Sequence, residues 1–179
     1  MDASHGNVAA AIAAAAAGIV SLAIAIPASA GGEKVAFPEK FASGILYATI
    51  DRTDLEQYRE FYAPAGALEA AKKGQPLPDG TVIVMAQYAA LLTASGQPQK
   101  GPKGGYVKGK RLGYMVMEKR AGWGAYVPQY RNGEWEYQAF MPDGKINHTA
   151  NILACFTCHK PLGKQDFVFS YDRMKAAAK

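Results

Sequence analysis

A five-residue stretch, Cys155-Phe156-Thr157-Cys158-His159, constrains this chain more than any other feature. It reads C-x-x-C-H, in which two residues separate a pair of thiols and an imidazole follows at once. This is the attachment signature of a c-type haem, because the thiols add to the two vinyl groups of the porphyrin and the histidine offers a ring nitrogen to the iron. The sequence therefore predicts one covalent haem c, held by Cys155 and Cys158, with His159 as the proximal iron ligand.

Other interpretations of the two thiols fit the chain less well. A thioredoxin-like redox pair belongs to a βαβ pattern, and no such pattern precedes Cys155. A structural zinc ion needs four ligands, whereas the chain holds two cysteines and three histidines, one of which is His5 in the leader. A disulfide within the motif would close a very small ring and constrain almost nothing. A redox dithiol remains as the alternative to haem attachment.

Residues 1–30 have the pattern of a secretory signal peptide. An almost wholly apolar segment, residues 8–26, precedes an A-x-A cleavage site at Ala28-Ser29-Ala30. Cleavage after Ala30 leaves residues 31–179 as one domain. Since thioether attachment to C-x-x-C-H takes place outside the cytoplasm, leader and motif together predict a periplasmic protein. The alternative is an uncleaved anchor, because 19 apolar residues just reach across a bilayer.

Charge restricts the partners that this chain can have. Removing Asp2, the only charged side chain in residues 1–30, raises the formal net charge from +5 to +6. A mildly basic surface favours an acidic redox protein as the partner. The lysines are spread out and no nucleic-acid-binding motif accompanies them, which argues against nucleic acid. A Gly/Lys-rich run over residues 100–111 is typical of a solvated loop.

Strand and helix patterns are mixed along the mature chain. Strands are expected over residues 44–50, 81–88, 112–119 and 134–140, which are rich in β-branched and aromatic residues. Helices are expected over residues 54–62 and 65–73, just before the haem motif, and after Asp172. This mixture, joined by short turns, predicts an α+β fold with an antiparallel sheet. Ordinary small c-type cytochromes differ, since they are all-helical and carry the motif near the N-terminus.

From about Tyr47 onward, the chain resembles the cytochrome P460 family, which includes the β-sheet cytochromes c′. The matching segments are residues 76–84 (PLPDGTVIV), 117–124 (MEKRAGWG), 132–137 (NGEWEY), 140–145 (FMPDGK), 155–160 (CFTCHK) and 166–169 (DFVF). The resemblance implies a five-stranded antiparallel sheet flanked by helices, and a homodimer. It also implies a five-coordinate haem that binds nitric oxide or oxidises hydroxylamine in the periplasm.

The resemblance further assigns residues to the haem pocket. Hydroxylamine-oxidising members carry a lysine, cross-linked to the porphyrin edge, at the position that aligns with Met85. A thioether cannot make that bond. Arg59, on the helix expected before the turn, corresponds to a family arginine in the haem pocket. Glu118 is the nearest counterpart of the family's distal carboxylate.

The sixth position on the iron separates the possible functions. A methionine there gives an electron carrier, and an open position gives binding of small ligands. Met85 is a candidate for ligation or for packing in the distal wall, while Met115 and Met117 share one strand face and are typical of a core. His148 is a candidate ligand or a surface residue, and Lys160 is a candidate partner of a propionate.

Aromatic side chains complete the set of candidates. Phe61 and Phe140 are typical of a core, although an aromatic cap on the distal side would exclude water and select small neutral ligands. The sequence thus favours an exported mono-haem cytochrome that binds a diatomic gas such as nitric oxide, with redox cycling of the iron. Electron transfer to a periplasmic partner is the second hypothesis. Hydroxylamine oxidation is the third, and Met85 argues against it.

Overall fold

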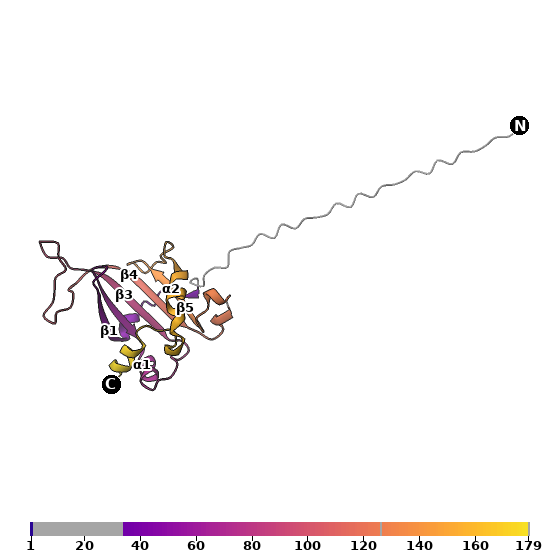
Figure 1. The fold of residues 1–179 in the computed structure, drawn as a ribbon, viewed down its shortest axis with the longest axis horizontal. Coiled ribbons are helices and arrows are strands. Elements are labelled where there is room, and N and C mark those ends of the chain that lie inside the picture. Colours follow the sequence, from indigo (N-terminus) through magenta and orange to yellow (C-terminus); the bar gives the residue numbers. More distant parts are fainter. Residues whose placement is uncertain (2–33, 126, 179) are drawn as a thin grey trace.

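The computed structural model describes residue 1, residues 34–125 and residues 127–178. The described residues from Lys34 onward form one antiparallel sheet with flanking helices (Figure 1). The strand order is β1-β2-β3-β4-β5, so that each strand pairs with its neighbours in the sequence. The strands are β1 (Ile45–Arg52), β2 (Gln57–Ala63), β3 (Val82–Ala90), β4 (Lys108–Lys119) and β5 (Trp135–Phe140). The expected α+β fold with a five-stranded antiparallel sheet is confirmed. The predicted leader lies outside the described residues, apart from Met1.

Three α-helices occur within the described residues. They are α1 (Ala65–Lys72), α2 (Ile152–His159), which carries the C-x-x-C-H motif, and α3 (Tyr171–Ala177). Short 3₁₀ turns lie between these elements: η2 (Phe41–Ser43), η3 (Trp123–Ala125), η4 (Pro128–Tyr130) and η5 (Lys160–Gln165). Among the described residues, no helix has both the length and the apolar character needed to cross a membrane.

The segment expected as a helix over residues 54–62 forms the end of a turn followed by strand β2, so that prediction is wrong. Its Leu, Glu, Gln and Arg residues favour a helix locally. In the sheet, however, Tyr58 and Tyr62 pack on one face while Arg59 and Phe61 point to the other. Strand β2 pairs with β1 along one edge and with β3 along the other. Packing on both faces and pairing at both edges outweigh the local helix propensity.

The sheet separates two hydrophobic clusters, because successive side chains of a strand point to opposite faces. One face packs against the helices, and its cluster includes Ile83, Met117, Trp135 and Tyr137 with Leu68, Phe156 and Met174. The other face packs against the chain before β1, and its cluster includes Val84, Tyr88, Tyr114, Val116 and Phe140 with Val35, Phe37 and Phe41. The C-x-x-C-H motif lies on the helical side, so the candidate site is built on that face.

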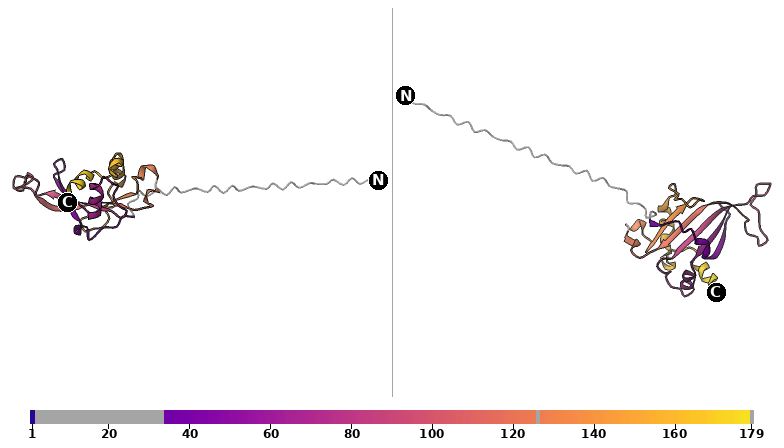
Figure 2. Two further views of the ribbon diagram at one scale, coloured as in Figure 1. Left: turned by 90° about the horizontal axis from the view of Figure 1, so that it is seen from below. Right: turned by 180° about the vertical axis from the view of Figure 1, so that it is seen from behind.

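The chain between β3 and β4 extends beyond the sheet (Figures 1 and 2). We call residues 91–111, which include the first residues of β4, the basic arm. Main-chain bridges between Leu92 and Pro98 and between Lys100 and Tyr106 order it. Asp51 Oδ2 at the end of β1 anchors it by accepting a hydrogen bond from Tyr106 N at 2.8 Å. The loop expected here is therefore an ordered projection held against the edge of the sheet.

Candidate haem site

Helix α2 is fixed from two sides, and this determines where its motif points. Asn151 caps the helix, because its side chain accepts a hydrogen bond from the main chain of the first turn at 3.3 Å. Asn132, which is fully buried, donates from Nδ2 to the Phe156 carbonyl at 2.9 Å. With Phe156 packed into the core, the flanking Cys155, Cys158 and His159 line a cavity.

The His159 ring is oriented by the main chain of the segment that follows it, residues 160–170, which we call the proximal segment. His159 Nδ1 lies 2.7 Å from the Phe167 carbonyl oxygen. Because a carbonyl only accepts, Nδ1 carries the proton and Nε2 keeps a free lone pair. The rings of Tyr137 and Phe169 lie 5.0 Å and 4.9 Å from the imidazole, centroid to centroid.

Burial lowers the pKa of His159, and the hydrogen bond with Phe167 offsets only part of this effect. The imidazole is therefore held in its neutral form. A neutral imidazole with Nε2 available is the form that binds a metal ion.

Both cysteines of the motif are free thiols. Burial raises the pKa of Cys155 to about 11, so this thiol stays protonated at neutral pH. Cys158, three residues further along α2, is exposed at the cavity edge. Two thiols that line one cavity are the groups that attachment to the two vinyl groups of a haem requires.

The cavity has a volume of about 710 Å³ and lies between α2, the proximal segment and strands β1 to β5. This size is typical of sites for cofactors and small molecules. Most of its lining is apolar, and includes Ile50, Phe61, Ile83, Met115, Met117, Tyr137, Val168 and Phe169. The structure thus brings together five of the candidate residues: Cys155, Cys158, His159, Arg59 and Met85.

The sheet side of the cavity is formed by a row of apolar side chains on three adjacent strands. Phe61 of β2 pairs with Met85 of β3, and Met85 pairs with Met115 of β4. We call these three residues the apolar row. Met115 and Met117, which the sequence assigned to the core, also line the cavity, and Met117 belongs to the adjacent core as well.

Arg59 lies on β2, rather than on the helix expected there, and contributes a cation to the cavity lining. Gln57 Oε1 accepts from Arg59 Nε at 3.1 Å and from Nη2 at 2.8 Å. Burial, together with the nearby charge of Arg52, lowers the pKa of Arg59. The guanidinium remains charged at neutral pH, because its ordinary pKa lies far above 7. Arg59 is therefore a partly buried, oriented cation suited to a carboxylate or an anionic ligand.

Four other candidates do not line the cavity. Glu118 lies on the opposite face of the sheet, where Arg120 Nε donates to its Oε1 at 2.5 Å, so its assignment as a distal carboxylate is wrong. Phe140 belongs to the cluster on that same opposite face. His148 is exposed in a turn before α2, and Lys160 is exposed and donates to the Pro128 carbonyl.

The residues that line the cavity fit a c-type haem. They provide an apolar chamber, a neutral imidazole with a free Nε2 and two thiols. Phe169 is 58% exposed and its ring packs edge-on against His159, so it lies at the rim of the cavity.

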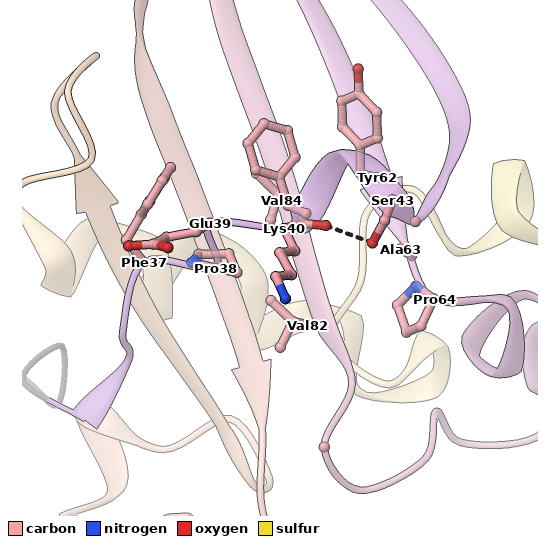
Figure 3. Close-up of a pocket in the computed structure, with 13 residues that line it drawn as sticks. Phe37, Pro38, Glu39, Lys40, Ser43, Tyr62, Ala63, Pro64, Val82 and Val84 are labelled. Atoms are coloured by element: carbon pink, nitrogen blue, oxygen red, sulfur yellow. Dashed lines mark hydrogen bonds between the residues drawn. The ribbon is translucent and has the colours of Figure 1, made fainter.

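A second cavity of about 590 Å³ lies on the other face of the sheet, beside Phe37, Phe41, Val82 and Val84 (Figure 3). The described residues that line this second cavity include no thiol and no imidazole. Its chemistry therefore does not suit a c-type haem, in spite of its similar size.

Sequence reasoning missed the residues that support the motif. Asn132 pins α2, Phe167 orients His159, and Val168, Phe169 and Ser170 line the cavity. A signal for them was present, since residues 132–137 and 166–169 are among the segments that resemble the P460 family. Their roles depend on tertiary contacts, which the local pattern does not specify.

Most of the chain matches the profile of a known protein family. The profile of the cytochrome P460 family, described as Cytochrome P460, matches residues 38–170. No match was found among curated proteins. The matched region spans the whole sheet, α1, α2 and the proximal segment. The chain therefore belongs to the cytochrome P460 family of haem-binding cytochromes.

Proposed function

We propose that this chain is an exported mono-haem c-type cytochrome that binds a small diatomic ligand such as nitric oxide, with redox cycling of the iron. When bound, the haem supplies an iron that changes between ferrous and ferric states and has a sixth position for a ligand. The observation that carries the proposal is the apolar row, Phe61, Met85 and Met115, which faces the same chamber as His159.

In this proposal, side chains of the protein act from two sides of the chamber. Cys155 and Cys158 would tether the haem, and His159 would bind the iron through Nε2. The apolar row would exclude water and favour a small neutral ligand over a polar one. Arg59, held by Gln57, would pair with a haem propionate or with an anionic ligand.

Export to the periplasm is part of the same proposal. Its support is the leader pattern in residues 1–30 and the requirement that thioether attachment occurs outside the cytoplasm. The homodimer implied by the family resemblance also stays a prediction.

Electron transfer is the second candidate function, and the charge of the basic arm favours it. Residues 91–111 contain five basic residues and no acidic one. The arm is anchored at Asp51, which lies between two residues that line the cavity, Ile50 and Arg52. An acidic partner attracted to the arm would therefore approach the end of the sheet that carries Ile50 and Arg52 of the cavity lining.

Hydroxylamine oxidation remains disfavoured. The side chain that faces the cavity at the aligned position is the thioether of Met85, and no lysine is among the described residues that line this cavity. A lysine cross-link to the porphyrin therefore has no nearby donor in the described part of the chain.

The ferrous absorption spectrum of the purified holoprotein tests the proposal. Binding of small ligands requires a five-coordinate, high-spin ferrous spectrum that changes when nitric oxide is added. The same spectrum is expected for Met85→Leu, since Met85 serves only as wall. A six-coordinate, low-spin spectrum that Met85→Leu converts to high spin would instead assign Met85 as an iron ligand and support the electron carrier. A strongly red-shifted Soret band would indicate a lysine cross-link and revive hydroxylamine oxidation.

A further inference from the structure

Two consecutive residues of the proximal segment have an unusual main-chain conformation. Asp166 and Phe167 have φ angles of 49° and 60°, in the left-handed region that favours glycine. Aspartate is tolerated there, whereas a bulky residue such as phenylalanine is rare. Strain of this kind persists only where the surroundings hold the chain in place. The structure should therefore contain contacts that impose it.

The Asp166 carboxylate provides the first of these contacts. Its Oδ2 accepts hydrogen bonds from Leu77 N and from Lys119 Nζ, each at 2.8 Å. The same ammonium group donates to the Leu77 carbonyl at 2.9 Å. The two charged side chains are 13% and 15% exposed, so solvent screens their interaction less than it screens a surface pair. One carboxylate thus joins the proximal segment to the end of β4 and to the turn before β3.

The Phe167 side chain provides the second contact. A Cβ placed on Gly133 would lie 3.1 Å from the Phe167 ring, so the ring packs directly on the glycine backbone. Phe167 N also donates to the Leu162 carbonyl at 2.9 Å. These contacts leave the Phe167 carbonyl directed at His159 Nδ1, at 2.7 Å.

We propose that Asp166 and Lys119 form a proximal clamp, which holds the Phe167 carbonyl on His159 and so sets how strongly the imidazole donates to the haem iron. Hydrogen bonding at Nδ1 raises the basicity of the ligating nitrogen, and partners of this kind tune a metal site strongly. The clamp therefore stabilises ferric over ferrous iron and strengthens the iron–histidine bond. Both residues are positioning residues, and the inference depends on the haem site proposed above.

Two single substitutions in the holoprotein, Asp166→Ala and Lys119→Met, test the clamp. The readouts are the iron–histidine stretching frequency of the ferrous protein, by resonance Raman spectroscopy, and the midpoint potential. Both variants should lower the frequency and make the potential more positive, changing the ferric-to-ferrous ratio at a fixed potential by about tenfold. Asp143→Asn is the matched control, because it removes an exposed ion pair of similar length, 2.9 Å to Lys145. The control should leave both readouts unchanged.

Further variants distinguish the effect of losing the clamp contacts from the effects of backbone strain and of misfolding. Asp166→Asn keeps an acceptor for Leu77 N and tolerates the left-handed region, so it should fold and give intermediate shifts. Asp166→Gly removes the strain and the carboxylate together, and it should shift both readouts as Asp166→Ala does. Wild-type values for Asp166→Gly, or for both Asp166→Ala and Lys119→Met, would overturn the clamp. Absence of covalent haem in the wild type would instead refute the proposed function itself.

Discussion

Arg59 reaches the cavity from a position in which Gln57 accepts hydrogen bonds from two of its nitrogens. The apolar row lies on the same face of the sheet, with Phe61 two residues further along β2. This places a held cation beside a surface that has no charge of its own. At the scale of single residues, the site should therefore distinguish anionic from neutral ligands.

Arg59→Leu should weaken anionic ligands selectively. A hydrogen bond to a charged group contributes about 1.5–3 kcal/mol, so azide binding to the ferric holoprotein should weaken roughly 10- to 100-fold. Nitric oxide binding to the ferrous protein should change by less than about threefold, because a neutral ligand gains little from the cation. Ligand titrations followed by absorption measure both affinities.

Arg52→Leu is the control for this experiment. Arg52 also lines the cavity, but its guanidinium is bound to Asp54 at 2.6 Å. It should affect azide binding much less than Arg59→Leu does. If Arg59→Leu weakened the affinities for azide and for nitric oxide equally, the substitution would have disturbed the pocket as a whole, and the selective role of Arg59 would be contradicted.

At the scale of elements, the sequence predicted most of the sheet but not β2. Strands β3 and β5 are predictable from their β-branched and aromatic residues, whereas residues 54–62 contain good helix formers. What makes β2 a strand is pairing with two neighbours. That information is distributed over the whole sheet and is absent from the local pattern.

In the candidate site, too, some residues were predictable from the local sequence, whereas others depend on tertiary contacts. The C-x-x-C-H spacing is local, so Cys155, Cys158 and His159 were predictable from it. Arg59 and Met85 came from the family resemblance, and both line the cavity with the motif. The contact between Lys119 and Asp166 joins residues 47 apart in the sequence, and no local pattern predicts it.

A buried carboxylate on the opposite face of the sheet connects β2 to β4. Lys108 Nζ donates to Glu60 Oε1 at 2.7 Å, and Tyr62 donates to Oε2 at 3.0 Å. Burial would raise the pKa of Glu60, but the hydrogen bonds from Lys108 and Tyr62 outweigh burial and lower it. The stability that Glu60 contributes is therefore present above its ordinary pKa and lost as pH falls through the lowered one.

Glu60→Gln should destabilise the protein in a pH-dependent way. At pH 7 its free energy of unfolding should fall by about 1–3 kcal/mol, because charge-assisted hydrogen bonds are lost. The difference in unfolding free energy from the wild type should narrow as pH falls from the ordinary pKa of a glutamate through the lowered pKa of Glu60, below which the wild-type carboxylate is protonated as well. Urea unfolding at a series of pH values measures it. Glu69→Gln is the control, because Glu69 lies on the exposed side of α1, and its unfolding free energy should equal that of the wild type. A loss of unfolding free energy in Glu60→Gln that stays constant with pH would contradict the role given to the Glu60 charge.

At the scale of the whole molecule, charge is distributed unevenly. The formal net charge of the chain is +5, and the basic arm alone contains five basic residues and no acidic ones. Lys108 is paired with Glu60, and Lys100 lies 3.5 Å from Asp51. Lys103 and Lys110 are exposed and extend the positive surface of the arm. Such a surface accelerates association with an acidic partner at low ionic strength.

Lys103→Glu combined with Lys110→Glu should slow electron exchange with an acidic electron-transfer protein such as a flavodoxin. The bimolecular rate should fall by about tenfold or more at low salt and depend less on ionic strength. Stopped-flow absorption of the haem measures the rate. The matched control, Lys73→Glu with Lys164→Glu, makes the same change in net charge at exposed sites outside the arm. If both double variants slowed electron exchange equally, the rate would depend on net charge alone and not on the basic arm.

The tether between haem and protein is the claim on which the account depends most, and denaturing electrophoresis with haem staining measures it directly. Protein made in a host competent in cytochrome c maturation should retain the stain after denaturation. The stain should be lost when Cys155 and Cys158 are both replaced by alanine. A colourless wild-type protein with both thiols free would contradict the account.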